Sequence, residues 1–263
     1  MPSPDPPSPL PPDSDQWTAL RTLTAARIGL ARSGASLATA PLLEFRLAHA
    51  RARDAVLAPL DAQQLRADLA KLGLPVLVAA SAAQDRQQYL MRPDLGRQLV
   101  AGDESALSLH AGTGHDLAFV IADGLSARAV ATHARPVLAE ALPRFAAEGW
   151  RIAPLVIVRH GRVAIGDAVA AALCARMMAI LIGERPGLSA PDSLGIYLTW
   201  QPGPHTTDAN RNCISNIRPE GIDYAAAAGK LMHLLRMIRQ RQMSGVALKD
   251  DSERPMIAMD LSD

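Results

Sequence analysis

The sequence predicts an α/β protein whose mostly parallel, Rossmann-like sheet is flanked by helices and preceded by a helical N-terminal region. Short apolar runs end at glycines and charged residues, as buried parallel strands do where they meet a loop. Helical patterns separate these runs along the chain, and such alternation is typical of parallel sheets. With 263 residues and 49% hydrophobic content, the chain is long enough to bury its own core.

The first hundred residues are expected to be mainly helical. Residues 1–14 are rich in proline and serine, and we expect a disordered lead because proline lacks a backbone donor and little of the segment is apolar. The helical region follows over residues 15–100 and includes the polar segment 84–99. Capping residues and the helical spacing of leucine and alanine predict one helix ending at Ser33–Gly34, a second starting at Pro41 and a third over residues 61–72.

The second part of the chain, residues 101–251, carries the alternating pattern and is expected to form the α/β domain. A tail over residues 252–263 follows it and has no assigned role. Pro136 and Pro143 are expected to interrupt the first helix of this domain, since proline removes a helical hydrogen bond. The expected strands cover residues 116–122, 151–159, 177–183 and 196–200, and the expected helices cover residues 126–148, 165–175 and 223–243.

Polar segments follow three of the expected strands, at residues 123–126, 183–189 and 208–218. In parallel α/β sheets, ligands bind at the carboxyl ends of the strands. We therefore expect these three loops to converge on one edge of the sheet. Their glycine, asparagine and arginine residues are not needed for packing, which favours a functional role for this edge.

Composition and charge argue against several classes of partner. Lysine and arginine number 27 against 26 acidic residues, a net charge of +1, so no electrostatic field favours nucleic acid or an anionic membrane. Aromatic residues make up 3%, which argues against base-stacking surfaces. The longest apolar tract, residues 163–182, contains Asp167 and Arg176, which argues against a membrane span. The two cysteines, Cys174 and Cys213, fit a reducing cytoplasm.

The sequence lacks the common catalytic and metal-binding motifs, so no catalytic residue or metal ligand is assigned from a motif. The segment Gly112–Gly114 lacks the third glycine of a dinucleotide fingerprint, and no phosphate loop is present. The seven histidines show neither a His-Glu-x-x-His pattern nor paired cysteine spacing, which argues against zinc. No Gly-x-Ser-x-Gly elbow exists, and a triad of Ser126, His133 and Asp123 would rest only on closeness in sequence.

Three further residues, Val163, Glu184 and Cys213, have simple structural interpretations when the residues are considered alone. Glu184 and its neighbour Arg185 can form an ion pair that orders a loop. Cys213 can be a small buried hydrophobic residue, and Val163 an ordinary core residue. Without further information, these structural roles are the preferred interpretation.

Longer strings of sequence carry a family resemblance. They are GRVAIGD at residues 161–167, LIGERPGLSAPDSLG at 181–195, RNCISNIRPEG at 211–221 and SGVALKD at 244–250. In this order, and together with earlier segments from Trp17 onward, they resemble the small (light) subunit of ethanolamine ammonia-lyase. Uninterrupted strings of this length are far more specific than a short motif.

The resemblance implies a subunit of an adenosylcobalamin-dependent lyase that converts ethanolamine to acetaldehyde and ammonia by a radical mechanism. In that family the small subunit pairs with a large barrel subunit in an oligomer of six of each. Ethanolamine binds in the large subunit, and the cobalamin, with its cobalt, lies between the two. The resemblance places cofactor contacts on Val163, Glu184 and Cys213, assigns no catalytic residue or metal ligand to this chain, and implies that the chain is inactive alone.

Two alternatives from other classes stay open. A stand-alone small-molecule enzyme would use Asp123, Ser126 and Glu184 at the sheet edge. A purely structural partner would stabilise the large subunit without touching the cofactor. Members of the family that reside in bacterial microcompartments carry an amphipathic N-terminal segment, whereas residues 1–15 have no apolar stripe. A cytoplasmic location is therefore expected, and encapsulation is doubtful.

Overall fold

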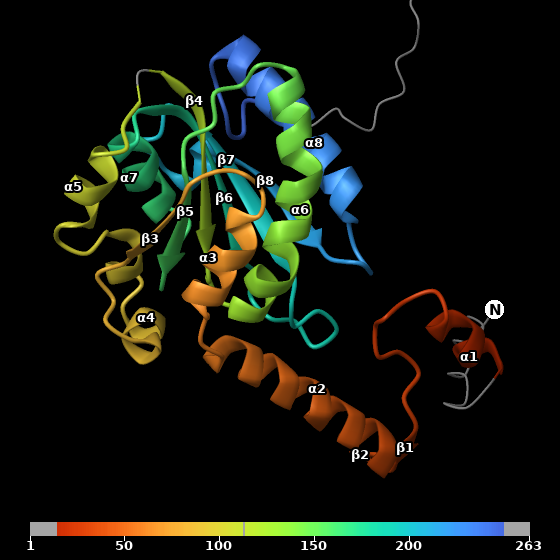
Figure 1. Ribbon diagram of the computed structural model, residues 1–263. Coiled ribbons are helices and arrows are strands. Elements are labelled where there is room, and N and C mark those ends of the chain that lie inside the picture. Colours follow the sequence, from red (N-terminus) through yellow and green to blue (C-terminus); the bar gives the residue numbers. More distant parts are fainter. Residues whose placement is uncertain (1–14, 113, 250–263) are drawn as a thin grey trace, which may run out of the picture.

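A six-stranded sheet between two layers of helices forms the body of the protein (Figure 1). The computed structural model describes residues 15–112 and 114–249. Within them the α/β class and the mostly parallel sheet with flanking helices are confirmed. The proposed lead, residues 1–14, and the proposed tail, residues 252–263, lie outside the described residues.

The order of the strands across the sheet is β3-β5-β4-β6-β7-β8. The first four are parallel, whereas β7 is antiparallel to β6 and β8 is antiparallel to β7. Consequently β8 runs in the same direction as β6, and the two carboxyl ends lie at the same edge. The strands are β3 (Val76–Ala80), β4 (His115–Ala122), β5 (Leu155–Arg159), β6 (Ala175–Gly183), β7 (Leu194–Trp200) and β8 (Arg211–Ile217).

One face of the sheet, which we call the covered face, packs against three helices. These are α3 (Ala62–Ala70), α6 (Ala127–Ala147) and α8 (Tyr224–Arg241). In its core the Phe145 ring packs edge-on against Phe119 at 5.7 Å and Trp150 at 5.2 Å between ring centroids. The expected interruption of α6 is wrong, since the helix continues through Pro136 and Pro143; packing of its buried face against the sheet outweighs the two lost backbone donors.

The opposite face, which we call the open face, is covered less completely. The short helices α5 (Asp103–Ser108) and α7 (Ile165–Ala172) bury its apolar side chains over β3, β5, β4 and β6. Farther along the same face, Tyr197 on β7 is half-buried, while Cys213 and Ser215 on β8 are exposed. The open face therefore presents polar side chains of β7 and β8 to solvent.

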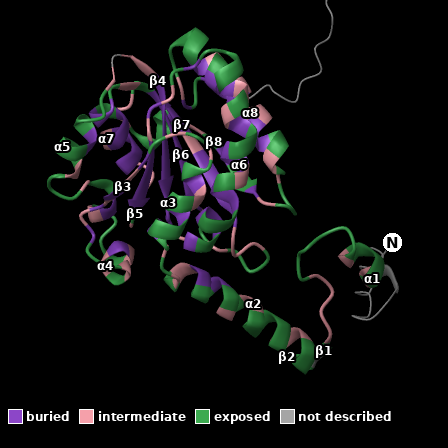
Figure 2. Ribbon diagram, in the orientation of Figure 1, coloured by how far each residue is buried: buried purple, intermediate pink, exposed green. Residues whose placement is uncertain are grey.

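An N-terminal arm extends outside this body. This arm comprises residues 15–57. Helix α2 (Thr39–Leu57) projects away from the body, with the segments β1 (Arg32–Ser33) and β2 (Ser36–Leu37) at its far end and α1 (Asp15–Arg21) beyond them (Figure 1). Figure 2 shows that α2 is largely exposed, including Leu43 and Leu47. The helix expected to reach Gly34 is shorter, because β1 and β2 form a hairpin there. Among the described residues, no helix is long and apolar enough to cross a membrane.

Two strands of the six-stranded sheet, β3 and β8, are not predicted by the sequence. The segment Val76–Ala80 lies in the region interpreted as mainly helical, but it pairs with β5 at the end of the sheet. The polar segment 84–99 contains only α4 (Arg86–Met91) and the short helix η1 (Leu95–Arg97). The sequence predicts a loop at β8 because most of the residues there are polar. Only its Ile214 and Ile217 side chains belong to the covered core.

Candidate functional site

The predicted site residues lie at the carboxyl edge of the sheet and on the adjoining open face. Val163 follows β5 and packs against the apolar cluster beneath α7, as Tyr197 does. Glu184 directly follows β6 and is half-buried, and Cys213 is exposed on β8. We call this edge the rim; it consists of residues 123–126, 160–163, 184, 193 and 215–218.

Glu184 ties three strand ends together. Its Oε1 accepts a hydrogen bond from Ser215 Oγ at 2.5 Å. Its Oε2 accepts one from Ser193 Oγ at 2.5 Å and another from the Asn216 N–H at 3.2 Å. A carboxylate has about four acceptor positions, so about one remains for another partner. We call this arrangement the Glu184 clasp.

Gly195 makes the clasp possible. It lies on β7, between the strand that precedes Glu184 and the strand that carries Ser215. A Cβ atom at Gly195 would lie 2.8 Å from Glu184 Oε1 and 3.1 Å from its Cγ. The missing side chain therefore lets Glu184 cross β7 and reach β8, a close approach that glycine in a strand often permits.

Cys213 and Tyr197 form the next pair along the open face. They are direct partners in the β7–β8 register, and their side chains are hydrogen-bonded. Partial burial, together with a smaller effect of the neighbouring Cys213, raises the pKa of Tyr197 to about 12. Burial is also the main cause that raises the pKa of the Cys213 thiol, against the lowering effect of the Tyr197 hydroxyl. Both groups are therefore protonated at neutral pH, and Cys213 is not an activated nucleophile.

A bulge shapes the rim end of β8. The β7–β8 register shifts between Leu194 and Ile196, and Asn216 has a left-handed φ of 60°. The extra residue returns Ile217 to the covered core while Ser215 remains exposed. Bulges of this kind re-aim side chains at the ends of strands, and here the result directs the Ser215 hydroxyl to the Glu184 clasp.

The rim is built differently from the three converging loops expected from the sequence. Strand β7 begins at the rim, and of the segment 208–218 only the carboxyl end of β8 and Arg218 reach it. Residues Asp208–Asn210 precede β8 and lie at the opposite edge of the sheet. The third loop at the rim is instead the one that follows β5 and carries Val163. The sequence missed this because the direction of β7 is set by pairing, not by its own residues.

Asp123 and Ser126 have structural partners. Asp123 Oδ1 accepts the Gly161 N–H at 3.1 Å. Ser126 Oγ accepts the Ala129 N–H at 3.3 Å, as the N-cap of α6, and donates to the Pro191 carbonyl at 3.0 Å. These bonds account for both side chains without a catalytic role and weaken the stand-alone enzyme hypothesis.

The catalytic triad considered for Ser126 does not form. His133 Nδ1 lies 2.9 Å from the Tyr224 hydroxyl, and its Nε2 lies 4.0 Å from Asp192 Oδ2. Burial lowers the pKa of His133, although Asp192 opposes this. In the described part of the chain, no group of three or more histidine, cysteine, aspartate or glutamate residues could hold a metal ion.

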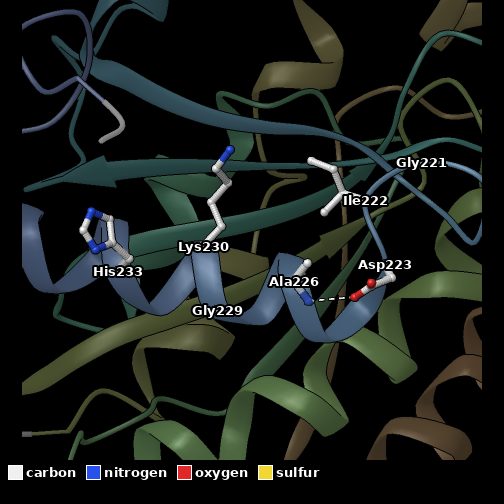
Figure 3. Close-up of a pocket in the computed structure, with 7 residues that line it drawn as sticks. All are labelled: Gly221, Ile222, Asp223, Ala226, Gly229, Lys230 and His233. Carbon is white, nitrogen blue, oxygen red and sulfur yellow. Dashed lines mark hydrogen bonds between the residues drawn. The ribbon is translucent and has the colours of Figure 1, made fainter. Parts of the chain in front are cut away.

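A separate hollow lies along α8, away from the predicted residues. In Figure 3 Lys230 extends from the helix, and Asp223 caps its first turn through the Ala226 N–H at 2.8 Å. This hollow contains none of the three predicted residues. It is lined by Gly221, Ile222, Asp223, Ala226, Gly229, Lys230 and His233.

Comparison with known proteins identifies the family. The profile of the family described as "Ethanolamine ammonia-lyase light chain" matches residues 14–249. The chain belongs to this family. It is 55% identical over 244 residues to the ethanolamine ammonia-lyase small subunit of Ralstonia nicotianae, covering 92% of this chain and 90% of that protein. The small subunit of Azotobacter vinelandii is 54% identical over 248 residues, covering 92% and 91%.

A third small subunit, from Xanthomonas campestris, is 53% identical over 258 residues and covers 96% of this chain and 94% of its own. The family resemblance seen in the sequence is thus confirmed. The chain belongs to a family of lyase subunits. The name "small subunit" implies a larger partner. Sequence reasoning missed Gly195, Tyr197, Ser193 and Ser215, of which only Gly195, a lone glycine within an apolar strand, gives a signal.

Proposed function

We propose that this chain is the small subunit of an adenosylcobalamin-dependent ethanolamine ammonia-lyase and forms part of its cobalamin site. The cofactor contacts would be Val163, Glu184 and Cys213, and the large subunit would bind ethanolamine and provide the catalytic groups. The observation that carries the proposal is that these residues share one edge and the open face of the sheet, in a chain that belongs to the light chain family. Assembly as six of each subunit and a cytoplasmic location remain predictions.

The chemistry of the open face fits cobalamin. A corrin ring carries amide side chains around an apolar macrocycle, so it needs hydrogen-bond acceptors beside apolar surface. Glu184 has about one acceptor position free, the Cys213 and Tyr197 side chains are protonated, and Val163 offers an apolar contact. When bound, the cofactor supplies a radical by homolysis of its cobalt–carbon bond.

The residues of this chain would act by binding and orienting the cofactor. The Glu184 carboxylate is held by Ser193, Ser215 and the Asn216 N–H, so little side-chain freedom is lost when a ligand amide binds to it. Val163 would exclude water from one side of the ligand. The protonated Cys213 thiol would contribute packing and a weak hydrogen bond.

A second function, a structural partner that does not contact the cofactor, is favoured by one observation. The Glu184 carboxylate already has three donors within the chain, which explains it as a brace between β6 and β8. The two functions differ in whether exchange of the rim residues changes cobalamin binding when assembly with the large subunit persists.

The test compares Glu184→Gln with Glu148→Gln in the assembled complex. Glu148 is the matched control because it also bridges separate elements, accepting from Trp150 Nε1 at 3.2 Å and pairing with Arg236. Because Glu184→Gln loses a charge-assisted hydrogen bond, we expect its dissociation constant for adenosylcobalamin to be ~10-fold larger. We expect the dissociation constant of Glu148→Gln to equal that of the wild type. Wild-type affinity in both Glu184→Gln and Cys213→Ala, with assembly intact, would establish the structural-partner function.

A further inference from the structure

The turn that carries Val163 is held by a buried carboxylate. His160 directly follows β5 and has a left-handed φ of 56°. The Gly161 N–H after it donates to Asp123 Oδ1 at 3.1 Å. Asp123 is buried, with 3% of its side chain exposed. Its Oδ2 lies 3.4 Å from His160 Nδ1 and 3.7 Å from Arg86 Nη1. The Asp123 carboxylate therefore contacts both the backbone of the turn, at Gly161, and one of its side chains, that of His160.

Arg86 connects this carboxylate to two other parts of the chain. Its Nη1 donates to the Gly124 carbonyl at 2.7 Å, and its Nε donates to the Val56 carbonyl near the end of α2 at 2.6 Å. Its guanidinium carbon also lies 4.8 Å from the centre of the Tyr89 ring. One side chain thus links the base of the N-terminal arm, the end of β4 and helix α4.

Tyr89 is another residue that contacts this turn. The buried Tyr89 hydroxyl donates to the Gly161 carbonyl at 3.3 Å. A second guanidinium carbon, that of Arg162, lies 4.2 Å from the centre of the same ring. Arg162 in turn donates to the Tyr89 carbonyl at 3.1 Å and, through its backbone N–H, to the Gly96 carbonyl at 2.7 Å.

The turn is fixed tightly at some conformational cost. His160 is a non-glycine residue in the left-handed region, which the surrounding contacts must stabilise. A Cβ atom at Gly161 would lie 2.9 Å from the Ala122 Cβ, so the turn packs directly on β4. Strained backbone held by surrounding contacts clusters at functional sites, and here the strained residue, His160, comes three residues before Val163, a proposed cofactor contact.

We propose that Arg86 and Asp123 are positioning residues for the cobalamin site: they hold the turn at residues 160–162 so that Val163 faces the cofactor. This inference rests on the proposed function, because it acts through Val163. Neither side chain needs to touch cobalamin. Since Arg86 also holds the Val56 carbonyl, the position of the turn is coupled to the base of the N-terminal arm.

The test substitutes, one at a time, the two buried aspartates at the ends of β4 in the complex with the large subunit: Asp123, which directly follows the strand, and Asp116. Asp123→Asn keeps an acceptor for the Gly161 N–H but removes the charge that faces Arg86 and His160. Asp116→Asn is the matched control: Asp116 is 3% exposed at the other end of β4, and it accepts the Arg151 N–H at 3.0 Å. Adenosylcobalamin affinity and hydrogen exchange of the amides of residues 161–163 are measured for both variants.

For Asp123→Asn we expect a ~10-fold weaker affinity for adenosylcobalamin and faster exchange at the turn. For Asp116→Asn we expect wild-type affinity and exchange at the turn. Tyr89→Phe removes only the hydroxyl bond to Gly161 and keeps the contacts of the ring with Arg86 and Arg162, so a ~3-fold loss of affinity is expected. This milder variant keeps the test decisive if Asp123→Asn fails to fold.

Two outcomes separate this inference from the proposed function on which it rests. If Val163→Asn loses cobalamin affinity while Asp123→Asn and Tyr89→Phe bind as tightly as Asp116→Asn, the positioning role is wrong and the cobalamin site stands. If Val163→Asn also binds normally, Val163 is not at the cofactor and the proposed site itself is wrong. An equal loss in Asp116→Asn and Asp123→Asn would show a general stability effect and overturn the positioning role.

Discussion

The two faces of the sheet differ in what covers the side chains of β8. On the covered face, Ile214 and Ile217 are buried against the core beneath α8. On the open face of the same strand, Cys213 and Ser215 are exposed. One short strand therefore contributes both to the covered core and to the open face, because its alternate side chains point to opposite sides of the sheet.

The polar groups of the open face bond mainly to one another. The Glu184 clasp and the Tyr197–Cys213 pair use neighbouring strands as partners, whereas the covered face is stabilised by burial of apolar area under helices. We therefore expect substitutions on the covered face to change stability and substitutions on the open face to change cobalamin affinity. The buried ion pair between Arg211 and Asp167 is an exception to this separation.

The largest effect is expected at a buried ion pair on the open-face side. Arg211 Nη1 and Nη2 donate to the two carboxylate oxygens of Asp167 at 2.9 and 2.6 Å. Arg211→Met leaves a buried carboxylate unpaired, and we expect the free energy of unfolding to fall by about 3–5 kcal/mol. Denaturant unfolding measures this change. The double variant Asp167→Leu with Arg211→Met should recover most of the loss; no recovery would contradict the assigned cause.

The second effect compares adjacent residues of β8. Ile214→Ala creates a cavity in the covered core, where Ile214 is 1% exposed, and should lower the free energy of unfolding by about 2–5 kcal/mol. Cys213→Ala, its neighbour on the open face, is the control and should change stability by no more than about 0.5 kcal/mol. Equal losses in the two variants would mean that the faces are not energetically different.

A third prediction concerns the crossing of β7 by Glu184. Gly195→Ala places a Cβ 2.8 Å from Glu184 Oε1, so the carboxylate must move away from Ser215. We expect ~10-fold weaker adenosylcobalamin binding by the assembled complex, the loss of about one charge-assisted hydrogen bond. Gly203→Ala is the control, since nothing lies within 4 Å of its added Cβ. Wild-type affinity for adenosylcobalamin in Gly195→Ala would show that the Glu184 clasp is not part of the cobalamin site.

The smallest effect is a pH dependence of stability that arises near the covered face. Burial lowers the pKa of His133 below its ordinary value of 6.5, so the unfolded chain binds this proton more readily. Stability is therefore full above pH 6.5 and falls as the pH drops below that value toward the lowered pKa, by at most about 1.4 kcal/mol per pH unit. His133→Gln should flatten the slope between pH 6.5 and 5.5 in thermal unfolding; an unchanged slope would assign it to another group.

Much of the fold could be predicted because its signals are local. The apolar strand β4 and the capped helices α6 and α8 follow from runs and spacings in their own residues. The edge strands β3 and β8 could not be predicted in this way. Residues Val76–Ala80 become a strand by pairing with β5, and the polar β8 becomes one by pairing with β7.

By itself, the sequence determined the α/β class, the family and the identity of Val163, Glu184 and Cys213 as residues of interest. The class follows from local periodicity, and the family follows from long matching strings. Only the tertiary structure decided that β7 is reversed, that Gly195 lets Glu184 reach Ser215, and that Arg86 and Asp123 hold the turn before Val163. These contacts join residues far apart in the chain, and their geometry depends on strand direction and register, which no single segment encodes.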